Sequence, residues 1–321
     1  MELSAPTVDT PPQPWTGRFD GDTPEHRRWW QAVEPLASAV DNAPGRPAVL
    51  LGFASDAGVA RNKGRVGAAK GPAAIRTALG PLAFHLDRMV FDAGDVTVEG
   101  DKLEPGQERL GSAVTPLIDA GALTVVLGGG HETAFASYLG VAQSHAVQDG
   151  LRLGVLNLDA HFDLRSYDPA HGGTRSSGTP FLQMAHAEAA EGRKLNYAVV
   201  GISEPNNTRA LFETAEELDV KFLLDEDCSP AATEEFVAAF LAGIDVLYLT
   251  IDLDVLPAAV APGVSAPAAY GVPLEIISAI CKQVAASGKL LHFDVAELNP
   301  AFDVDSRTAK VAARLVNTLL R

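Results

Sequence analysis

The stretch Leu153-Gly-Val-Leu-Asn-Leu-Asp159-Ala-His161-Phe-Asp163 joins a short apolar run to three alternating residues that can bind a metal ion. Side chains alternate along an extended chain, so Asp159, His161 and Asp163 can converge on one point where a strand runs out into a loop. Two carboxylates and an imidazole suit a hard or borderline divalent cation. Taken alone, the same pattern also fits an ordinary polar loop.

Two further stretches end in residues of the same kind. Val125-Val-Leu-Gly-Gly-Gly-His131-Glu132 is an apolar run with a glycine turn and a histidine, and Leu249-Thr-Ile-Asp252-Leu-Asp254 carries two aspartates. The aspartates alone could cap helices or form turns. The glycine run lacks both nucleotide-binding patterns, G-x-G-x-x-G and Gly-Lys-Ser/Thr. All three stretches follow predicted strands, and the carboxyl edge of an α/β sheet is where sites are built. Together they offer enough ligands for two ions, and paired ions activate water for hydrolysis.

Apolar β-branched or leucine-rich runs alternate with alanine-rich segments of helical period along the whole chain. We expect strands at residues 48–53, 89–92, 123–127, 153–158, 197–201, 220–224, 246–251 and 289–293. We expect helices at residues 72–79, 108–120, 132–147, 180–190, 208–218, 233–241, 273–287 and 304–320. This alternation predicts an α/β fold with a mostly parallel sheet covered on both faces.

Composition narrows the classes of partner. The chain has 321 residues, 47% of them hydrophobic, and a formal net charge of −16. An acidic surface argues against nucleic acid or an anionic membrane as partner, and an anionic substrate would need local arginines. No stretch approaches the length of a membrane span, and the N-terminus does not resemble a signal peptide. With Cys228 and Cys281 as the two cysteines, we expect reduced thiols and a cytoplasmic protein.

The N-terminal segment differs in composition from the rest. Residues 1–44 are expected to form an arm, mobile over its first dozen residues, and a docking segment that carries Trp15, Trp29 and Trp30. Residues 45–321 show no linker and no internal repeat, so we expect a single catalytic domain there.

Four motifs together resemble a known family. Gly128-Gly-Gly-His131-Glu, Asp159-Ala-His161-Phe-Asp163, Asp252-Leu-Asp254-Val-Leu and Asp294-Val-Ala-Glu297 are similar to the ordered motifs of the ureohydrolases, the arginase family. The resemblance implies a three-layer α/β/α sandwich around a doubly wound, eight-stranded parallel sheet. It also implies a homo-oligomer, a trimer or a hexamer, that acts on a small molecule.

Further segments resemble the formimidoylglutamase branch of that family. They include Trp15-Thr-Gly-Arg18, Arg61-Asn62-Lys-Gly64-Arg65, His161-Phe-Asp163-Leu-Arg165 and Ser176-Ser-Gly-Thr-Pro-Phe181. The reaction implied is hydrolysis of N-formimidoyl-L-glutamate to L-glutamate and formamide, a step of histidine degradation. The cofactor implied is two Mn²⁺ ions per subunit.

The resemblance also implies roles for individual residues. One ion would be held by His131, Asp159, Asp163 and Asp252, and the other by Asp159, His161, Asp252 and Asp254. Asp163 would accept a hydrogen bond from the attacking water, and Glu297 would pair with the planar amidinium end of the substrate. These two are the expected catalytic residues.

The substrate's two carboxylates need partners. Arg165 is the first candidate because arginine grips carboxylates bidentately, followed by Asn62, Arg65 and Arg175, although Arg65 and Arg175 could equally be surface arginines. Ser177 is the last substrate-binding candidate, and it stands where arginases and agmatinases carry a histidine regarded as a proton shuttle. The general acid therefore stays open between Asp163, a water at the metals and His171.

Three rival functions fit parts of the pattern. A guanidino-compound amidinohydrolase that releases urea would share the metal centre, but Ser177 and Arg165 argue against it. A deacetylase-like hydrolase with a single zinc would need fewer ligands than the six present. A catalytically silent, metal-stabilised assembly protein would be expected to have lost some of them.

Overall fold

A parallel sheet of nine strands forms the centre of the computed structural model, which describes residues 2–41 and 45–321, without the side chains of Asp41 and His171. The spatial order of the strands is β2-β5-β4-β6-β11-β10-β7-β8-β9, and every neighbouring pair is parallel. Their bounds are β2 Val33–Pro35, β4 Ala48–Ala54, β5 Val90–Thr97, β6 Leu123–Leu127, β7 Leu153–Leu158, β8 Asn196–Ile202, β9 Lys221–Leu224, β10 Val246–Asp252 and β11 Leu290–Ala296.

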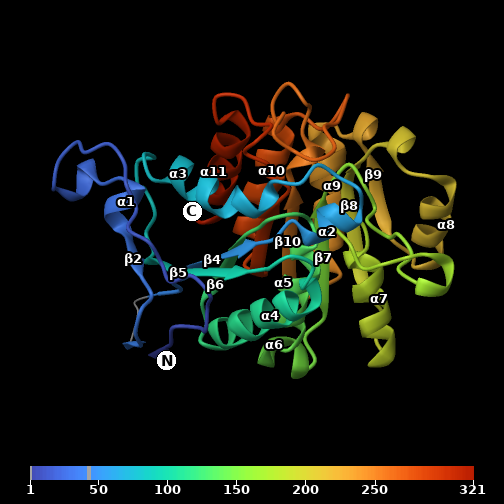
Figure 1. Cartoon of the computed structure of the whole chain (residues 1–321), viewed down its shortest axis with the longest axis horizontal. Coiled ribbons are helices and arrows are strands. Elements are labelled where there is room, and N and C mark those ends of the chain that lie inside the picture. Colours follow the sequence, from blue (N-terminus) through green and yellow to red (C-terminus); the bar gives the residue numbers. More distant parts are fainter. Residues whose placement is uncertain (1, 42–44) are drawn as a thin grey trace.

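Helices cover both faces of this sheet (Figure 1). One hydrophobic core holds side chains of α3 (Gly71–Leu79), α9 (Pro230–Ala242), α10 (Leu274–Ala286) and α11 (Arg307–Leu319). A second core holds those of α4 (Leu103–Asp119), α5 (Thr133–Ala142), α7 (Pro180–Ala190) and α8 (Arg209–Glu217). Shorter helices are α1 (Trp29–Ala32), α2 (Ala57–Arg61) and α6 (His145–Gln148). The prediction of a three-layer α/β/α sandwich is therefore confirmed.

The sheet has one strand more than the eight expected. The eight predicted strands are present, and β2 adds a ninth at the edge beside β5. β2 is only three residues long and ends in proline, so it shows no alternation that could have been read from the sequence.

Two predicted helices differ from those observed. Residues 132–147 form two helices, because Ser144 adopts an extended backbone and its hydroxyl donates to the carbonyl of Val141 at 2.6 Å. Helix α4 begins at Leu103, about a turn before the expected residue 108. Pro105 is tolerated there because the N–H groups of a first helical turn have no helical partner.

The N-terminal segment lies against the domain. Strand β1 (Glu2–Leu3) pairs with β3 (Val40–Asp41), Thr10 pairs with Asp95, and the Trp15 indole donates to Asp92 at 2.7 Å. These contacts differ from the mobile stretch that we expected for the first dozen residues. The domain boundary expected after residue 44 lies outside the described residues, so that division stays a prediction.

The central strands bring the sequence motifs to one edge of the sheet. Strands β6, β11, β10 and β7 are consecutive neighbours, and Asp252 at the end of β10 is in register with Ala296 at the end of β11. Since all four strands are parallel, the residues that follow them meet at the carboxyl edge. No helix in residues 2–41 and 45–321 has the length and apolar character needed to cross a bilayer.

Candidate active site

A glycine turn after β6 brings His131 to the carboxyl edge of the sheet. A Cβ on Gly129 would lie 1.8 Å from the carbonyl oxygen of Ser55, so no larger residue fits there. The backbone N–H of Gly130 donates to the same carbonyl at 2.9 Å. The turn is therefore packed directly against the end of β4, which fixes the direction in which His131 leaves it.

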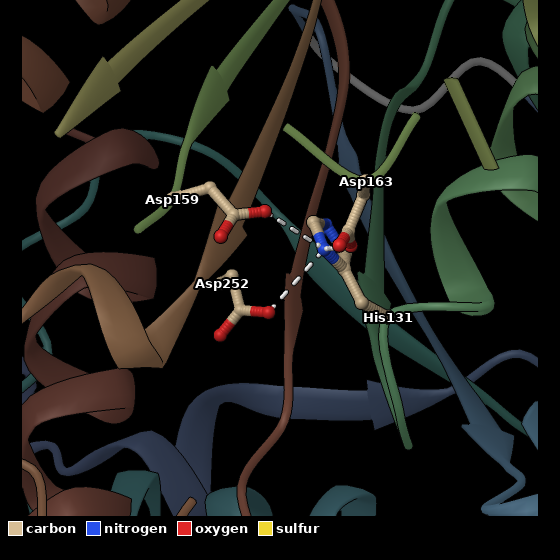
Figure 2. Close-up of side chains that lie close together, drawn as sticks. All are labelled: His131, Asp159, Asp163 and Asp252. Carbon is tan, nitrogen blue, oxygen red and sulfur yellow. Dashed lines mark hydrogen bonds and ion pairs between the residues drawn. The ribbon is translucent and has the colours of Figure 1, made fainter. Parts of the chain in front are cut away.

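Three carboxylates, those of Asp159, Asp163 and Asp252, converge on the His131 imidazole (Figure 2). Its Nδ1 lies 2.9 Å from Asp163 Oδ2, 3.1 Å from Asp159 Oδ2 and 3.3 Å from Asp252 Oδ2. One ligand atom from each of the four residues lies within 4.8 Å of the others. This is the first ligand group predicted from the sequence.

A second group uses the other oxygen of Asp159. His161 Nδ1 lies 3.1 Å from Asp254 Oδ2 and 3.5 Å from Asp159 Oδ1. Asp159 thus presents Oδ2 to the first group and Oδ1 to the second, as a bridging carboxylate would. Asp252 falls within the first group only, and its Oδ1 accepts the backbone N–H of Asp254 at 2.8 Å. A bridging role for Asp252 therefore stays a prediction.

The electrostatics of these buried carboxylates fit a pair of divalent cations. Burial, followed by the neighbouring carboxylates of Asp254 and Asp159, raises the pKa of Asp252 well above its usual value. Burial and the charge of Asp159 likewise raise the pKa of Asp163. Carboxylates crowded in this way repel one another unless cations lie between them. Aspartate oxygens and imidazole nitrogens are suitable donors for Mn²⁺ or a similar ion.

Behind His131, a hydrogen-bonded chain fixes the orientation of the imidazole. His131 Nε2 lies 3.0 Å from Thr250 Oγ1, and that hydroxyl donates to Asp294 Oδ1 at 2.6 Å. Tyr248 donates to the other Asp294 oxygen at 2.5 Å. Because the Thr250 proton is engaged, Nε2 must carry the imidazole hydrogen, which leaves the Nδ1 lone pair directed at the carboxylates.

No role was expected for Thr250 or Asp294 from the sequence, although the sequence holds a signal for Thr250. Thr250 stands two residues before Asp252 on the same strand, so the two side chains share one face of the sheet. A polar residue at that position of an otherwise apolar strand indicates a side chain that hydrogen-bonds to a candidate metal ligand.

Glu297 lies beside the ligands at the end of β11. Its Oε1 accepts the backbone N–H of His131 at 2.8 Å, and its Oε2 is buried without a hydrogen-bond partner among the described residues. Burial and the neighbouring Glu132 carboxylate raise the pKa of Glu297 to about 8. Glu297 and Asp163 both have left-handed backbones, with φ of 69° and 50°. Such conformations are strained for residues other than glycine and concentrate at functional sites.

A cavity of about 590 Å³ opens over these residues. Its lining includes His131, His161, Asp163, Asp252, Asp254 and Glu297. Arg165, Asn62 and Ser177 form part of the wall. Asn62 Nδ2 donates to Ser177 Oγ at 3.2 Å, whereas the Arg165 guanidinium has no hydrogen bond or ion pair to any described residue.

The two other predicted arginines are engaged elsewhere. Arg65 reaches the cavity wall, but its guanidinium donates to the carbonyls of Ser265 and Val264 and stacks on the Phe302 ring at 4.0 Å. Arg175 does not line the cavity, and its guanidinium lies 5.9 Å from the Tyr167 ring. The side chain of His171 lies outside the described residues.

Lys63 lines the cavity and was missed in the sequence analysis. It is exposed and has a left-handed backbone with φ of 60°. It stands between Asn62 and Arg65, which were the substrate-binding residues expected in this motif. The cavity wall thus presents two cations, Arg165 and Lys63, whose side chains have no hydrogen bond or ion pair to the described residues.

A family model described as the arginase family matches residues 46–321. The chain belongs to the arginase family. One relative is the formimidoylglutamase of Rhodococcus opacus, 56% identical over 97% of this chain and 95% of that one. The formimidoylglutamase of Nocardia farcinica is 58% identical over 95% of each chain. Among solved structures, the formiminoglutamase of Trypanosoma cruzi with Mn²⁺ has a TM-score of 0.75 and 26% identity, over 86% of this chain and 92% of that one. This arginase-family chain therefore matches formimidoylglutamases over nearly its full length.

Proposed function

We propose that the chain hydrolyses N-formimidoyl-L-glutamate to L-glutamate and formamide, as an enzyme of histidine degradation that uses two Mn²⁺ ions. One observation carries the proposal. The two oxygens of Asp159 face two ligand groups, and nearby one buried oxygen of Glu297 has no hydrogen-bond partner among the described residues. The names of relatives 56% and 58% identical support the choice of substrate. The sequence-based prediction of a hydrolase acting on the C–N bond of a linear amidine agrees with them.

The ligand sets follow the two observed groups. His131, Asp159, Asp163 and Asp252 would hold one ion, and Asp159, His161 and Asp254, joined by Asp252, the other. Bound in this way, the two ions would lower the pKa of a water molecule so that it attacks at neutral pH. The manganese bound by the Trypanosoma cruzi relative supports that metal here.

The chain's own residues orient the substrate and move its protons. Oε2 of Glu297 is free to accept a hydrogen bond from the formimidoyl nitrogen and so fix the reacting carbon. Asp163 accepts the proton of the attacking water, and the C–N bond to glutamate breaks as its nitrogen takes up a proton. Ser177 is held by Asn62 and has no imidazole to offer. Asp163 is therefore the nearest proton carrier in this proposal.

Recognition of the substrate's carboxylates falls to the cavity wall. Arg165 is free to form a bidentate pair, and Asn62 and Ser177 offer polar groups beside it. Arg65 and Arg175 are weaker candidates, because Arg65 is committed to backbone carbonyls and Arg175 points away. Agmatine has no carboxylate and would leave this wall unused. For that reason the urea-releasing alternative is not favoured.

The assembly and the location belong to the same proposal. The family match to residues 46–321 supports one catalytic domain over residues 45–321. The two cysteines, Cys228 and Cys281, are buried and unpaired, which suits a reducing compartment such as the cytoplasm. A homo-oligomer, trimer or hexamer, follows from the family resemblance, and light scattering after gel filtration measures it.

A product assay tests the function. The protein, loaded with Mn²⁺, is given formimidoylglutamate, arginine, agmatine and guanidinobutyrate, and formamide and urea are measured separately. We expect formamide from the first substrate and little urea from the others. Urea as the main product would favour the guanidino-compound alternative. Two bound ions without any turnover would favour the silent assembly protein.

A further inference from the structure

Helix α2 begins without a side-chain cap of its own. Its N-cap residue, Asp56, makes no side-chain hydrogen bond to the helix. Asp56 Oδ2 instead accepts the backbone N–H of Gly67 at 2.7 Å. Ser55 Oγ accepts the N–H of Ala57 at 3.4 Å, so the next N–H of the first turn, that of Gly58, needs an acceptor from elsewhere in the chain.

Glu132 provides that acceptor. Its Oε1 accepts the backbone N–H of Gly58 at 2.9 Å and the hydroxyl of Ser55 at 2.7 Å. Glu132 is fully buried and stands at the N-cap of α5, yet it makes no side-chain bond to that helix. Its carboxylate reaches away from α5 and caps a helix that lies 74 residues earlier in the chain.

Two glycines make room for this carboxylate. A Cβ on Gly58 would lie 2.6 Å from Glu132 Cδ, and a Cβ on Gly130 would lie 2.2 Å from Glu132 Oε2. Glu132 is therefore enclosed between α2 on one side and the glycine turn that carries His131 on the other. Gln107 donates to the Glu132 carbonyl at 2.9 Å and closes the site from α4.

The segment that leaves α2 runs directly into the cavity wall. Asn62 is the C-cap of α2, and Asn62, Lys63 and Arg65 all line the cavity. The outer side of this segment is tied by Arg61 to Asp101 and Glu104. The side that faces the metal ligands is tied by Glu132. The orientation of α2 thus sets where Asn62 and Lys63 lie relative to the ligand groups.

We propose that Glu132 is a positioning residue that fixes α2, and with it the cavity-lining residues 62–65, at a set distance from His131. The link to the substrate rests on the proposed function, in which this wall receives the carboxylate-bearing part of formimidoylglutamate. Glu132 does not line the cavity and lies in neither ligand group. Its loss is therefore expected to act on substrate binding and on the mobility of α2, and on the chemical step only through the pKa of Glu297.

The test compares Glu132→Ala with Glu132→Gln in the full-length, manganese-loaded protein. Hydrogen exchange of the amides of residues 57–65 is measured together with metal content, kcat and KM. Because Glu132→Ala leaves the buried Gly58 N–H and Ser55 hydroxyl without their acceptor, it is expected to speed exchange in this segment about tenfold or more and to raise KM by a similar factor. Metal content should stay within about threefold, and kcat is compared at the plateau of its pH profile, because loss of the Glu132 carboxylate also lowers the pKa of Glu297. Gln keeps an oxygen acceptor for Gly58 and Ser55, so it should restore most of the protection and of the KM.

A matched control is Glu188→Ala, another buried glutamate, which bonds Tyr138 and Arg193 on the outer part of the domain. It should lower Tm without changing exchange in residues 57–65 or KM.

Unchanged exchange and KM in Glu132→Ala would overturn the proposal, as would faster exchange spread evenly over the chain. Where Glu132→Ala does not fold, Ser55→Ala removes the Ser55 bonds to Glu132 and to the N–H of Ala57, keeps the Gly58 bond, and should loosen the same segment to a smaller extent. No loosening there would equally overturn it. The exchange result stands even if the substrate proves to be another amidine.

Discussion

Thr250 lies behind His131, on the side of the imidazole opposite the carboxylates, with Oγ1 3.0 Å from Nε2. This contact decides which ring nitrogen carries the hydrogen, and so leaves Nδ1 free to bind a metal ion. Asp294 in turn fixes the Thr250 hydroxyl. Thr250 thus lies two positions before the candidate ligand Asp252 on β10, yet it orients His131, which follows β6.

Replacing Thr250 by valine should weaken metal binding without removing any ligand. Loss of a hydrogen bond behind a metal-bound histidine lowers metal affinity by about 10- to 100-fold. Calorimetric titration of the metal-free protein with Mn²⁺ measures the metal affinity. Thr250→Ser keeps the hydroxyl and should bind like the original chain. If valine and serine behave alike, the tautomer of His131 is not set by Thr250.

Asp252→Asn should deplete the metal and abolish turnover. The substitution removes a charge from the first ligand group, in which Asp252 Oδ2 lies 3.3 Å from His131 Nδ1. Metal content is counted by mass spectrometry after gel filtration. Asp245→Asn, which affects an exposed pair with Arg152, is the control and should retain two ions per chain. Two ions and full activity in Asp252→Asn would contradict the ligand assignment.

Glu297→Gln should keep both ions and lose most of the turnover. Glutamine can still accept the His131 N–H, but it replaces the free Oε2 with a donor that repels the amidine nitrogen. We expect kcat to fall by about 10²-fold or more. Metal analysis and steady-state kinetics on the same sample separate the two effects. A variant that loses metal would instead identify Glu297 as a ligand.

Arg165→Lys should raise the KM for formimidoylglutamate while both ions stay bound. Lysine keeps the charge but loses the planar fork, and a bidentate charge-assisted contact is worth roughly 10- to 150-fold in binding. Arg165→Ala should be more severe, yet nearly neutral for any activity on agmatine. Arg152→Lys, on an exposed arginine paired with Asp245, is the control. An unchanged kcat/KM in both Arg165 variants would transfer carboxylate recognition to Lys63 and Asn62.

His292 should contribute to acid sensitivity. Burial lowers the pKa of His292 to about 3, while Thr124 holds its Nδ1 at 2.7 Å. The unfolded chain then binds a proton below pH 6.5 that the folded chain does not, so stability falls as pH drops below that value. Between pH 7 and pH 5 this difference in proton binding lowers the free energy of unfolding by about 2 kcal/mol. His292→Gln should show a smaller loss of Tm over that range, measured by circular dichroism. An equal loss would assign the acid sensitivity to other groups.

The meeting of the six candidate ligands at one edge could be predicted from the sequence, because neighbouring parallel strands and one alternating run carry them. Asp159, His161 and Asp163 alternate on one short run, and parallel strands bring their ends to one edge whatever the loops do. The partner of a ligand is harder to recognise. The position of Thr250, two residues before Asp252 on an apolar strand, indicates a polar partner, but only its contact with His131, 119 residues away, shows which ligand it orients.

The substrate wall could not be predicted in the same way, because distant contacts decide where its long side chains point. Arg65 turns to the carbonyl of Ser265, 200 residues further along the chain, and Arg175 turns toward Tyr167. Glu132 was part of a motif in the sequence, but its contact with Ser55 lies 77 residues away. Such pairings depend on how loops fold over the sheet, and no periodicity encodes them.

The left-handed backbones of Asp163 and Glu297 affect which substitutions these two positions can accept. For a residue with a Cβ, this conformation costs about 1 kcal/mol or more, and glycine avoids that cost. Glycine would relieve that strain, but at position 297 it would also leave the backbone N–H of His131 without its acceptor. The chain thus keeps carboxylates at two positions where backbone strain alone favours glycine, as is expected of side chains needed for function.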